Sequence, residues 1–222
     1  MYDLIPGDII SETVAHNGIY DWPHTKLMVH EACKTKGGLL VDVGANLGYF
    51  SFLWAGLNTC ARVVAFEASP RNIKLFQSSI EKNHMGNRIN LIPKALGDRS
   101  DMVTFDVGPP EQTGWGGISK VSSDNTFTVP MVRLDEELPD TQIDILKIDV
   151  EGADTWVLFG CENLLKKKKI EIIYFEQNRD RMAALGIAPD DAQKFLLRMG
   201  YACHPLNPNE DEWMAYPHKN EQ

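Results

Sequence analysis

The sequence has few cysteines and no long apolar run. Its four cysteines stand apart at positions 33, 60, 161 and 203, and no two of them form a Cys-x-x-Cys pair. This spacing favours reduced thiols in a reducing compartment over a disulfide framework or a zinc knuckle. No apolar run approaches the roughly 18 residues that cross a bilayer, and residues 1–12 show no basic segment followed by an apolar stretch. We therefore expect a cytoplasmic protein that does not contact a membrane.

Positive charge is also scarce. The chain has 22 lysines and arginines against 31 aspartates and glutamates, which gives a formal net charge of −9. Proteins that bind nucleic acids contact the phosphates through clustered lysines and arginines, so no nucleic-acid partner is expected. The one basic cluster, residues 166–169, ends a predicted helix. Cations are favoured at helix C-termini, so we interpret this cluster as a solvated helix end.

What the sequence does contain is an alternation of short apolar strands and helices. Strands are predicted at residues 39–43, 61–66 and 89–95, and helices at 50–57 and 70–83. Short connections between such segments are typical of βαβ units, which build a parallel sheet with helices on both faces. The sequence therefore predicts an α/β fold.

An insertion then interrupts the alternation. Residues 102–107 and 126–132 alternate like antiparallel strands, so they predict a β-hairpin between the third and fourth parallel strands. The loop between them is long, rich in glycine, proline and serine, and contains Trp115. Long loops inside compact domains are often functional, so Trp115 is a candidate lid or stacking platform for a ring. The alternative is that Trp115 fills the core beneath its own loop.

The C-terminal part resumes the α/β pattern. Its predicted elements are strands at 143–148 and 170–175, helices at 153–165 and 190–199, and a terminal β-hairpin at 201–206 and 213–216. At 222 residues and 43% hydrophobic composition, the chain fits one domain with a sizeable core. We predict a single domain, with an N-terminal preface at 1–37 and the core at 38–222.

The segment VDVGANLGYF joins the first strand to a helix through a glycine turn. The dinucleotide-binding fingerprint is G-x-G-x-x-G. If its first glycine is aligned with Gly44, its second and third glycines fall at Asn46 and Tyr49. The NAD-dependent oxidoreductases therefore become the disfavoured alternative. The pattern present is D-x-G-x-N-x-G, with Asp42 and Gly48 at its ends. An acidic residue beside such a turn suits a ligand with a cationic amine and no pyrophosphate, such as S-adenosylmethionine (SAM).

A second acidic residue supports this interpretation. Glu67 ends the second strand, 19 residues after Gly48. An acidic residue at about this distance accepts ribose hydroxyls in nucleotide-binding sheets, so we expect Glu67 to accept both hydroxyls of a ribose. The alternative is that Gly44 and Gly48 only serve a tight turn.

Four motifs in this order resemble the FkbM family of SAM-dependent methyltransferases: VDVGANLGYFS, VVAFEASP, IPKALGD and ILKIDVEGADTWVLFG. The resemblance implies a Rossmann-like class I methyltransferase sheet, mostly parallel, with an antiparallel strand in the C-terminal hairpin. It also implies SAM as the cofactor, with residues 95–98 beside the adenine, and hydroxyls of sugars or small natural products as acceptors. The predicted cofactor-binding residues are Asp42, Gly44, Ala45, Asn46, Gly48, Glu67, Ala95 and Asp149.

Carboxylates follow the fourth and fifth strands, where open α/β sheets bind their ligands. They are Asp149, Glu151 and Glu176, with Gln177 next to the last. One hypothesis is a Mg²⁺ site formed by Asp149, Glu176 and the amide of Gln177, similar to the layout in catechol-type methyltransferases. The other is general-base catalysis by a carboxylate. A purely structural alternative has Glu151 capping the next helix while Asp149 binds cofactor or backbone.

His24 in the preface is a further candidate base, because a preface often folds over the cofactor in this class of enzyme. The resulting prediction is a SAM-dependent O-methyltransferase that acts on a sugar, a glycan or a small hydroxylated metabolite. The rival from another class is a SAM-binding regulatory or assembly subunit without turnover.

Overall fold

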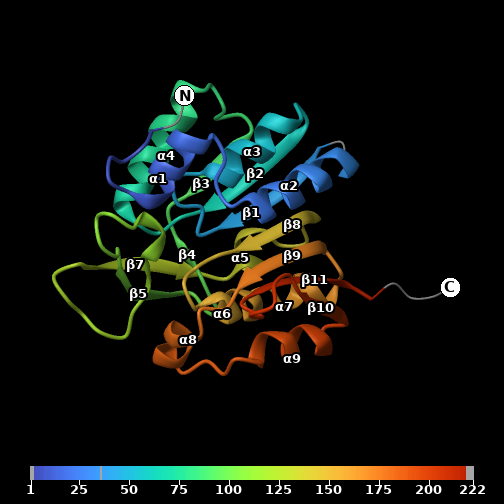
Figure 1. Cartoon of the computed structure of the whole chain (residues 1–222). Coiled ribbons are helices and arrows are strands. Elements are labelled where there is room, and N and C mark those ends of the chain that lie inside the picture. The colour runs from blue at the N-terminus through green and yellow to red at the C-terminus, as the bar shows by residue number, and fades with distance from the viewer. Residues whose placement is uncertain (1–2, 36, 219–222) are drawn as a thin grey trace.

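The computed structural model describes residues 3–35 and 37–218 (Figure 1). Its centre is a seven-stranded sheet in the order β10-β11-β9-β8-β1-β2-β3. Strand β11 pairs antiparallel with both neighbours, whereas the pairs among β9, β8, β1, β2 and β3 are parallel. The predicted fold class is confirmed. The strands are β1 (Gly38–Val43), β2 (Ala61–Phe66), β3 (Ile89–Ile92), β8 (Ile143–Ile148), β9 (Ile170–Glu176), β10 (Tyr201–Pro205) and β11 (Glu212–Pro217).

Helices cover both faces of this sheet, which is why its central strands are almost continuously apolar. Successive residues of a strand point to opposite faces, so Leu40 packs on one side and Val41 on the other. The helices on the first side are α2 (Trp22–Thr35), α3 (Tyr49–Leu57) and α4 (Pro70–Lys82), and those on the second side are α6 (Asp154–Phe159), α7 (Glu162–Lys166) and α9 (Asp191–Arg198). Two further helices, α1 (Ile9–Asn17) and α8 (Arg179–Leu185), pack outside these two core layers.

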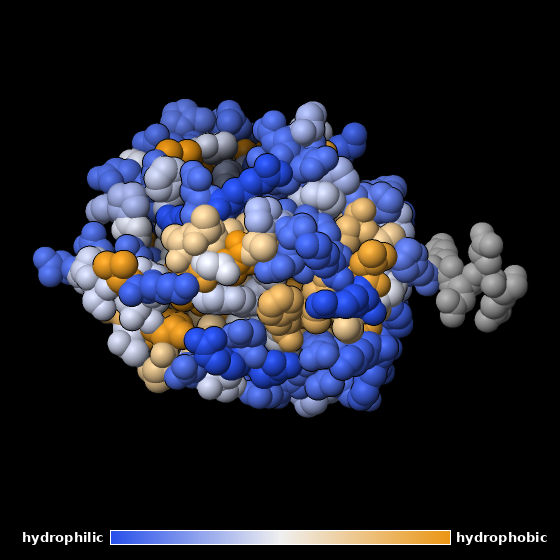
Figure 2. All heavy atoms as spheres, turned by 90° about the horizontal axis from the view of Figure 1, so that it is seen from below, coloured by the Kyte–Doolittle hydropathy of each residue, from blue (hydrophilic) through white to orange (hydrophobic). Residues whose placement is uncertain are grey.

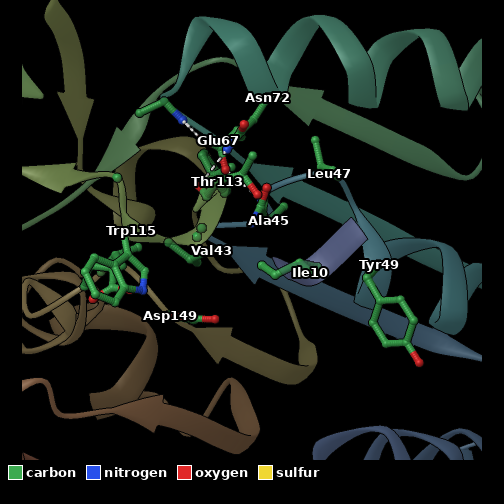
Figure 3. Close-up of a pocket in the computed structure, with 18 of the residues that line it drawn as sticks. Ile10, Val43, Ala45, Leu47, Tyr49, Glu67, Asn72, Thr113, Trp115 and Asp149 are labelled. Atoms are coloured by element: carbon green, nitrogen blue, oxygen red, sulfur yellow. Dashed lines mark hydrogen bonds between the residues drawn. The ribbon is translucent and has the colours of Figure 1, made fainter. Parts of the chain in front are cut away.

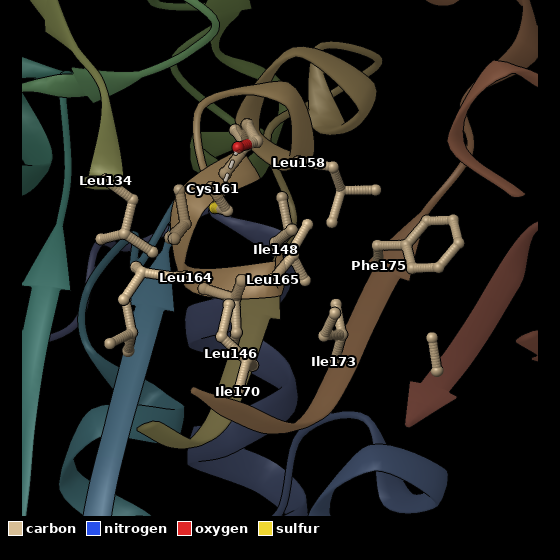
Figure 4. Packing of buried hydrophobic residues seen from close by; sticks show 14 of the residues in the cluster. Leu134, Leu146, Ile148, Leu158, Cys161, Leu164, Leu165, Ile170, Ile173 and Phe175 are labelled. Atoms are coloured by element: carbon tan, nitrogen blue, oxygen red, sulfur yellow. Dashed lines mark hydrogen bonds between the residues drawn. The ribbon is translucent and has the colours of Figure 1, made fainter. Parts of the chain in front are cut away.

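The core on the second side is made by α6, α7 and α9 against the sheet. Leu158, Leu164 and Leu165 pack on Leu146 and Ile173, and all five side chains are buried (Figure 4). The surface beyond these helices carries hydrophilic side chains with apolar ones scattered among them (Figure 2). None of the helices in the described residues is long and apolar enough to cross a membrane.

The helix predicted at 153–165 is in fact two helices, α6 and α7, with Gly160 between them. Two contacts explain the break. A Cβ on Gly160 would lie 2.1 Å from the carbonyl oxygen of Gly97, so the chain passes here with no room for a side chain. The carboxylate of Asp135, in the short helix α5 (Leu134–Glu137), accepts hydrogen bonds from the backbone N–H groups of Asn163 and Leu164. These bonds satisfy N–H groups at the start of α7.

The predicted hairpin insertion is present, but it belongs to a second, four-stranded sheet in the order β4-β7-β5-β6. The strand predicted at 89–95 ends at Ile92, and Ala95 instead pairs with Met131 of the insertion. The third-strand prediction was therefore wrong at its C-terminal end. The strands of this sheet are β4 (Ala95–Leu96), β5 (Asp101–Asp106), β6 (Gly117–Ile118) and β7 (Thr126–Val132).

The packing at Gly160 gives a stability test. Gly160→Ala should lower the free energy of unfolding by about 3 kcal/mol, because the backbone of Gly97 cannot yield to a methyl group. The matched control is Gly56→Ala, in the exposed part of α3 with nothing within 4 Å of the added carbon. It should stabilise the protein by up to about 1 kcal/mol through helix propensity. Urea denaturation of both variants measures the difference, and equal shifts would contradict this account of the break.

Candidate functional site

A cavity of about 310 Å³ opens at the carboxyl ends of β1, β2, β8 and β9 (Figure 3). The glycine turn and the end of β2 line one end of it. The strand-end carboxylates and Tyr20 line the other, and residues of α1 and of the long insertion loop cover it. Of the predicted cofactor-binding residues, the cavity is lined by Gly44, Ala45, Asn46, Glu67, Ala95 and Asp149.

The two glycines of the turn are required by packing against the protein itself. Both have left-handed backbone, with φ of 73° at Gly44 and 86° at Gly48. A Cβ on Gly44 would lie 1.9 Å from the carbonyl oxygen of Asp149, and one on Gly48 would lie 2.1 Å from the ring of Phe76. Gly48 does not line the cavity. Both glycines let the turn fit against β8 and α4, and Gly44 also lines the cavity, so its predicted contact with a cofactor stays a prediction.

Glu67 holds the turn in place. Its carboxylate accepts hydrogen bonds from the backbone N–H groups of Asn46 (2.7 Å), Ala68 (3.0 Å) and Ser69 (2.7 Å). Burial raises the pKa of Glu67 to about 7 against the opposing effect of these three bonds. A carboxylate has about four lone-pair positions, so three bonds leave room for about one more donor. That Glu67 also accepts the hydroxyls of a ribose stays a prediction.

Lys147, near the carboxyl end of β8, is a buried cation that was not among the predicted site residues. Its Nζ lies 3.5 Å from Oδ1 of Asp42 and 3.4 Å from Oδ2 of Asp149, and 5.2 Å from the ring centre of Phe50. Burial opposes the charge, yet the two carboxylates raise the pKa of Lys147. The signal was available: a lysine interrupts the apolar run ILKID, and two residues along a strand place Lys147 and Asp149 on one face.

This ion pair accounts for Asp42. Its other carboxylate oxygen accepts a hydrogen bond from Oγ of Ser51 at 2.7 Å, and Asp42 does not line the cavity. The charge of Asp42 is matched by Lys147 and its side chain does not reach the cavity, so of the predicted contacts with the ammonium of a cofactor only one through water stays a prediction. Asp149, by contrast, does line the cavity (Figure 3).

Glu151 and Glu176 line the cavity beside Asp149. Oε2 of Glu151 accepts a hydrogen bond from Nδ2 of Asn178 at 3.0 Å and lies 3.5 Å from Nε of Arg181. The structural alternative for Glu151 is wrong, since α6 begins after Ala153 without a side-chain cap.

The side chain of Glu176 makes no hydrogen bond or ion pair within residues 3–35 and 37–218. Loss of solvation and the carboxylates of Asp149, Asp154 and Glu151 raise the pKa of Glu176. Burial and Asp149 likewise raise the pKa of Glu151.

The predicted Mg²⁺ ligands are not brought together. Gln177 follows Glu176 on the strand and points to the opposite face, where its amide exchanges hydrogen bonds with Gln193 and donates to the carbonyl of Pro189. Among the described residues, no three His, Cys, Asp or Glu side chains are grouped to hold a metal ion. Lys147 lies beside Asp149, so the donors present do not fit Mg²⁺. The predicted Mg²⁺ ligands Asp149, Glu176 and Gln177 therefore do not form a metal site.

His24 lies behind the wall of the cavity, not in it. Its Nδ1 is 2.7 Å from Oδ2 of Asp21, and its ring packs edge-on against Phe50 and Tyr174. Burial works against protonation, but the contact with Asp21 raises the pKa of His24. The structure therefore does not place His24 where a catalytic base would lie, whereas its neighbour Phe50 does line the cavity. Tyr20 of the preface does reach the cavity, and no motif pointed to it.

The cover of the cavity joins two segments that are far apart in the sequence. The buried carboxylate of Asp8 caps α1 through the N–H of Ser11 and accepts from both the N–H and the hydroxyl of Thr113. Trp115 follows in the same loop, is 54% exposed, and lines the cavity (Figure 3). The alternative that Trp115 fills the core beneath its loop is therefore wrong. Its carbonyl accepts a hydrogen bond from Arg181 at 2.7 Å, which fixes the loop on the other side.

The buried lysine gives a second stability test. Lys147→Met should destabilise the protein by about 3–5 kcal/mol, because it leaves Asp42 as an uncompensated buried charge. The control Lys166→Met removes a solvent-exposed pair with Glu162 and should change stability little. Urea denaturation measures both, and a small effect at Lys147 would show that Asp42 does not depend on this cation.

Comparisons with known proteins agree with this architecture. The family model described as the methyltransferase FkbM domain matches residues 42–203. Hexuronic acid methyltransferase AglP of Haloferax volcanii is 24% identical over 190 residues, which cover 84% of this chain and 72% of that protein.

Two solved structures share the fold. The crystal structure of methyltransferase FkbM from Methylobacillus flagellatus superposes with a TM-score of 0.57 at 16% identity, over 82% of this chain. This chain spans only 44% of that protein. The S-adenosylhomocysteine-bound methyltransferase PaMTH1 of Podospora anserina gives a TM-score of 0.54 at 14% identity, over 88% of this chain and 78% of that one. With more than half of its length matched by the family model, the chain belongs to the FkbM methyltransferase domain family.

Proposed function

We propose that this protein is a SAM-dependent methyltransferase that methylates a hydroxyl group of a sugar, a glycan or a small hydroxylated metabolite. One observation carries the proposal. A single cavity connects the glycine turn and Glu67 at one end with Asp149, Glu151 and Glu176 at the other. A cofactor bound at the first end would therefore face an acceptor at the second.

At the end of the cavity proposed for the cofactor, several side-chain oxygens have no hydrogen-bond donor within the protein. The amide oxygens of Asn46, Asn72 and Gln112 are buried without a partner, and all three residues line the cavity. The orientation of Asn72 is fixed because its Nδ2 donates to the carbonyl of Thr113. Buried acceptors of this kind call for a ligand with donors. The ribose hydroxyls, the adenine amino group and the ammonium of SAM are such donors, so the residues present fit this cofactor.

Apolar side chains complete this end. Ala95, Leu96 and Phe105 line the cavity next to Glu67 and suit a flat, weakly polar ring such as adenine. The structural relative from Podospora anserina holds S-adenosylhomocysteine, the product form of the same cofactor, which supports the proposal. When bound, SAM supplies an electrophilic methyl group on a sulfonium.

The chain's own residues would prepare the acceptor. A raised pKa makes Glu176 a stronger base once it is ionised, so Glu176 is suited to accept the proton of the acceptor hydroxyl as the pH rises toward its pKa. Asp149, held by Lys147, keeps a fixed negative charge beside it. Tyr20, Phe50 and Trp115 line the same cavity and would help to position the acceptor, which favours a displacement that depends on position.

Calorimetry tests the cofactor. SAM and S-adenosylhomocysteine should bind, and NAD⁺ should not. Glu67→Gln should weaken SAM binding about 10- to 100-fold, the effect of losing one hydrogen bond to a charged group. Glu162→Gln, on the exposed surface of α7, serves as the control and should bind normally. Tight NAD⁺ binding without SAM binding would overturn the proposal. SAM binding without methyl transfer to any sugar or phenol tested would instead support a regulatory subunit.

The pKa of Glu67 gives a pH dependence. Because burial raises this pKa to about 7, Glu67 is largely protonated at pH 6 and ionised at pH 8 in the unliganded protein. The ionised form is the better acceptor for a ribose hydroxyl, so affinity for SAM should rise between these pH values. Glu67→Gln removes the titrating group and should flatten the rise. An identical pH profile in the two proteins would show that another group controls it.

A further inference from the structure

The acceptor end of the cavity is the part lined by Tyr20, Lys147, Asp149, Glu151 and Glu176. Three of these five side chains are carboxylates. The side chain of Glu176 makes no ion pair within the described residues, and its surroundings include the further carboxyl group of Asp154. The acceptor end is therefore rich in carboxyl groups, which are negative wherever they are ionised.

The cations nearby are already paired. Lys147 lies between Asp42 and Asp149, at 3.5 and 3.4 Å. The guanidinium of Arg181, at the rim, is 3.5 Å from Glu151 and donates to the carbonyl of Trp115. Lys94, at the cofactor end, is 2.7 Å from Glu137. Among residues 3–35 and 37–218, each cation that lines the cavity thus has an acidic partner in place.

From this charge arrangement we propose that the sugar unit that receives the methyl group is neutral or carries an amine, and is not a uronic acid. A carboxylate on that unit would enter between Asp149, Glu151 and Glu176, where Lys147 and Arg181 already have acidic partners and no unpaired arginine or lysine lines the cavity within the described residues. Proteins recognise carboxylates through such cations. The inference rests on the proposed function and narrows its acceptor class. It separates this protein from its relative, the hexuronic acid methyltransferase AglP.

A second hollow, next to Glu176, is the reason why the proposal excludes a negative charge only on the sugar unit that receives the methyl group. This polar hollow of about 350 Å³ shares Glu176 with the main cavity and lies between α8 and the turn of the β10–β11 hairpin. Its cation, Arg179, is exposed and donates to the carbonyls of Asn209 and Glu210. A negative group on a longer acceptor would meet its first exposed cation here, beyond Glu176. The remaining lining residues are Gln177, Asn178, Asp180, Asn209 and Asp211.

Binding measurements test the charge preference without relying on turnover. The probes are methyl β-glucoside, methyl β-glucosaminide and methyl β-glucuronoside, titrated by ligand-detected NMR into protein saturated with S-adenosylhomocysteine. At a pH above the raised pKa of Glu176, where its carboxyl group is ionised, the glucoside and the glucosaminide should bind about tenfold or more tightly than the glucuronoside, because like charges oppose the last. Raising the ionic strength should reduce this difference by screening.

Substitutions connect the preference to the carboxylates. Glu176→Gln and Glu151→Gln should each raise the relative affinity for the glucuronoside several-fold, while Glu162→Gln should leave the ratio unchanged. The inference is overturned if the glucuronoside binds as tightly as the glucoside, if neither Glu176→Gln nor Glu151→Gln changes the ratio, or if none of the three glycosides binds. Failure of S-adenosylhomocysteine to bind in the same samples would instead overturn the proposed function, so the two failures are distinguishable.

Discussion

The ion pairs of Lys147 with Asp42 and Asp149 are the constraint on which the site depends. Asp42 lies on β1 and Lys147 opposite it on β8, so the pairs join the two central strands of the sheet. A buried cation between two carboxylates is stable only with good geometry. Asp149 then has a fixed place at the end of β8, and its carbonyl occupies the space left open by Gly44. The glycine turn, and Glu67 bonded to Asn46 of that turn, are positioned in consequence.

Much of the fold was predictable because local signals and tertiary structure agree. Apolar runs flanked by glycine, and Pro70 at the start of α4, marked the parallel strands and their helices. Where the prediction was wrong, a contact from a distant part of the chain decided the outcome. Gly160 looked like an ordinary helix residue until Gly97, more than sixty positions earlier in the sequence, was found against it.

In the candidate site, too, local sequence predicted some features and contacts from distant parts of the chain decided the others. Strand ends placed Asp149, Glu151, Glu176 and Glu67 at the cavity, because topology brings the carboxyl ends of parallel strands together. The partners of these side chains were not predictable from spacing alone. Side chains alternate between the two faces of a strand, so this rule alone places Gln177 on the face opposite Glu176 and places Lys147 on the same face as Asp149. The cover could not be foreseen, since Asp8 and Thr113 are 105 residues apart.

The place of β11 in the sheet has a consequence for how the chain assembles. This strand pairs with β9 and with β10, both of which precede it in the sequence. Until Glu212–Pro217 is in position, β9 presents an open edge, and β10 has no partner through which to join the sheet. Open strand edges promote pairing with other chains. Misassembly during synthesis or refolding should therefore concentrate at β9, the strand that also carries Glu176.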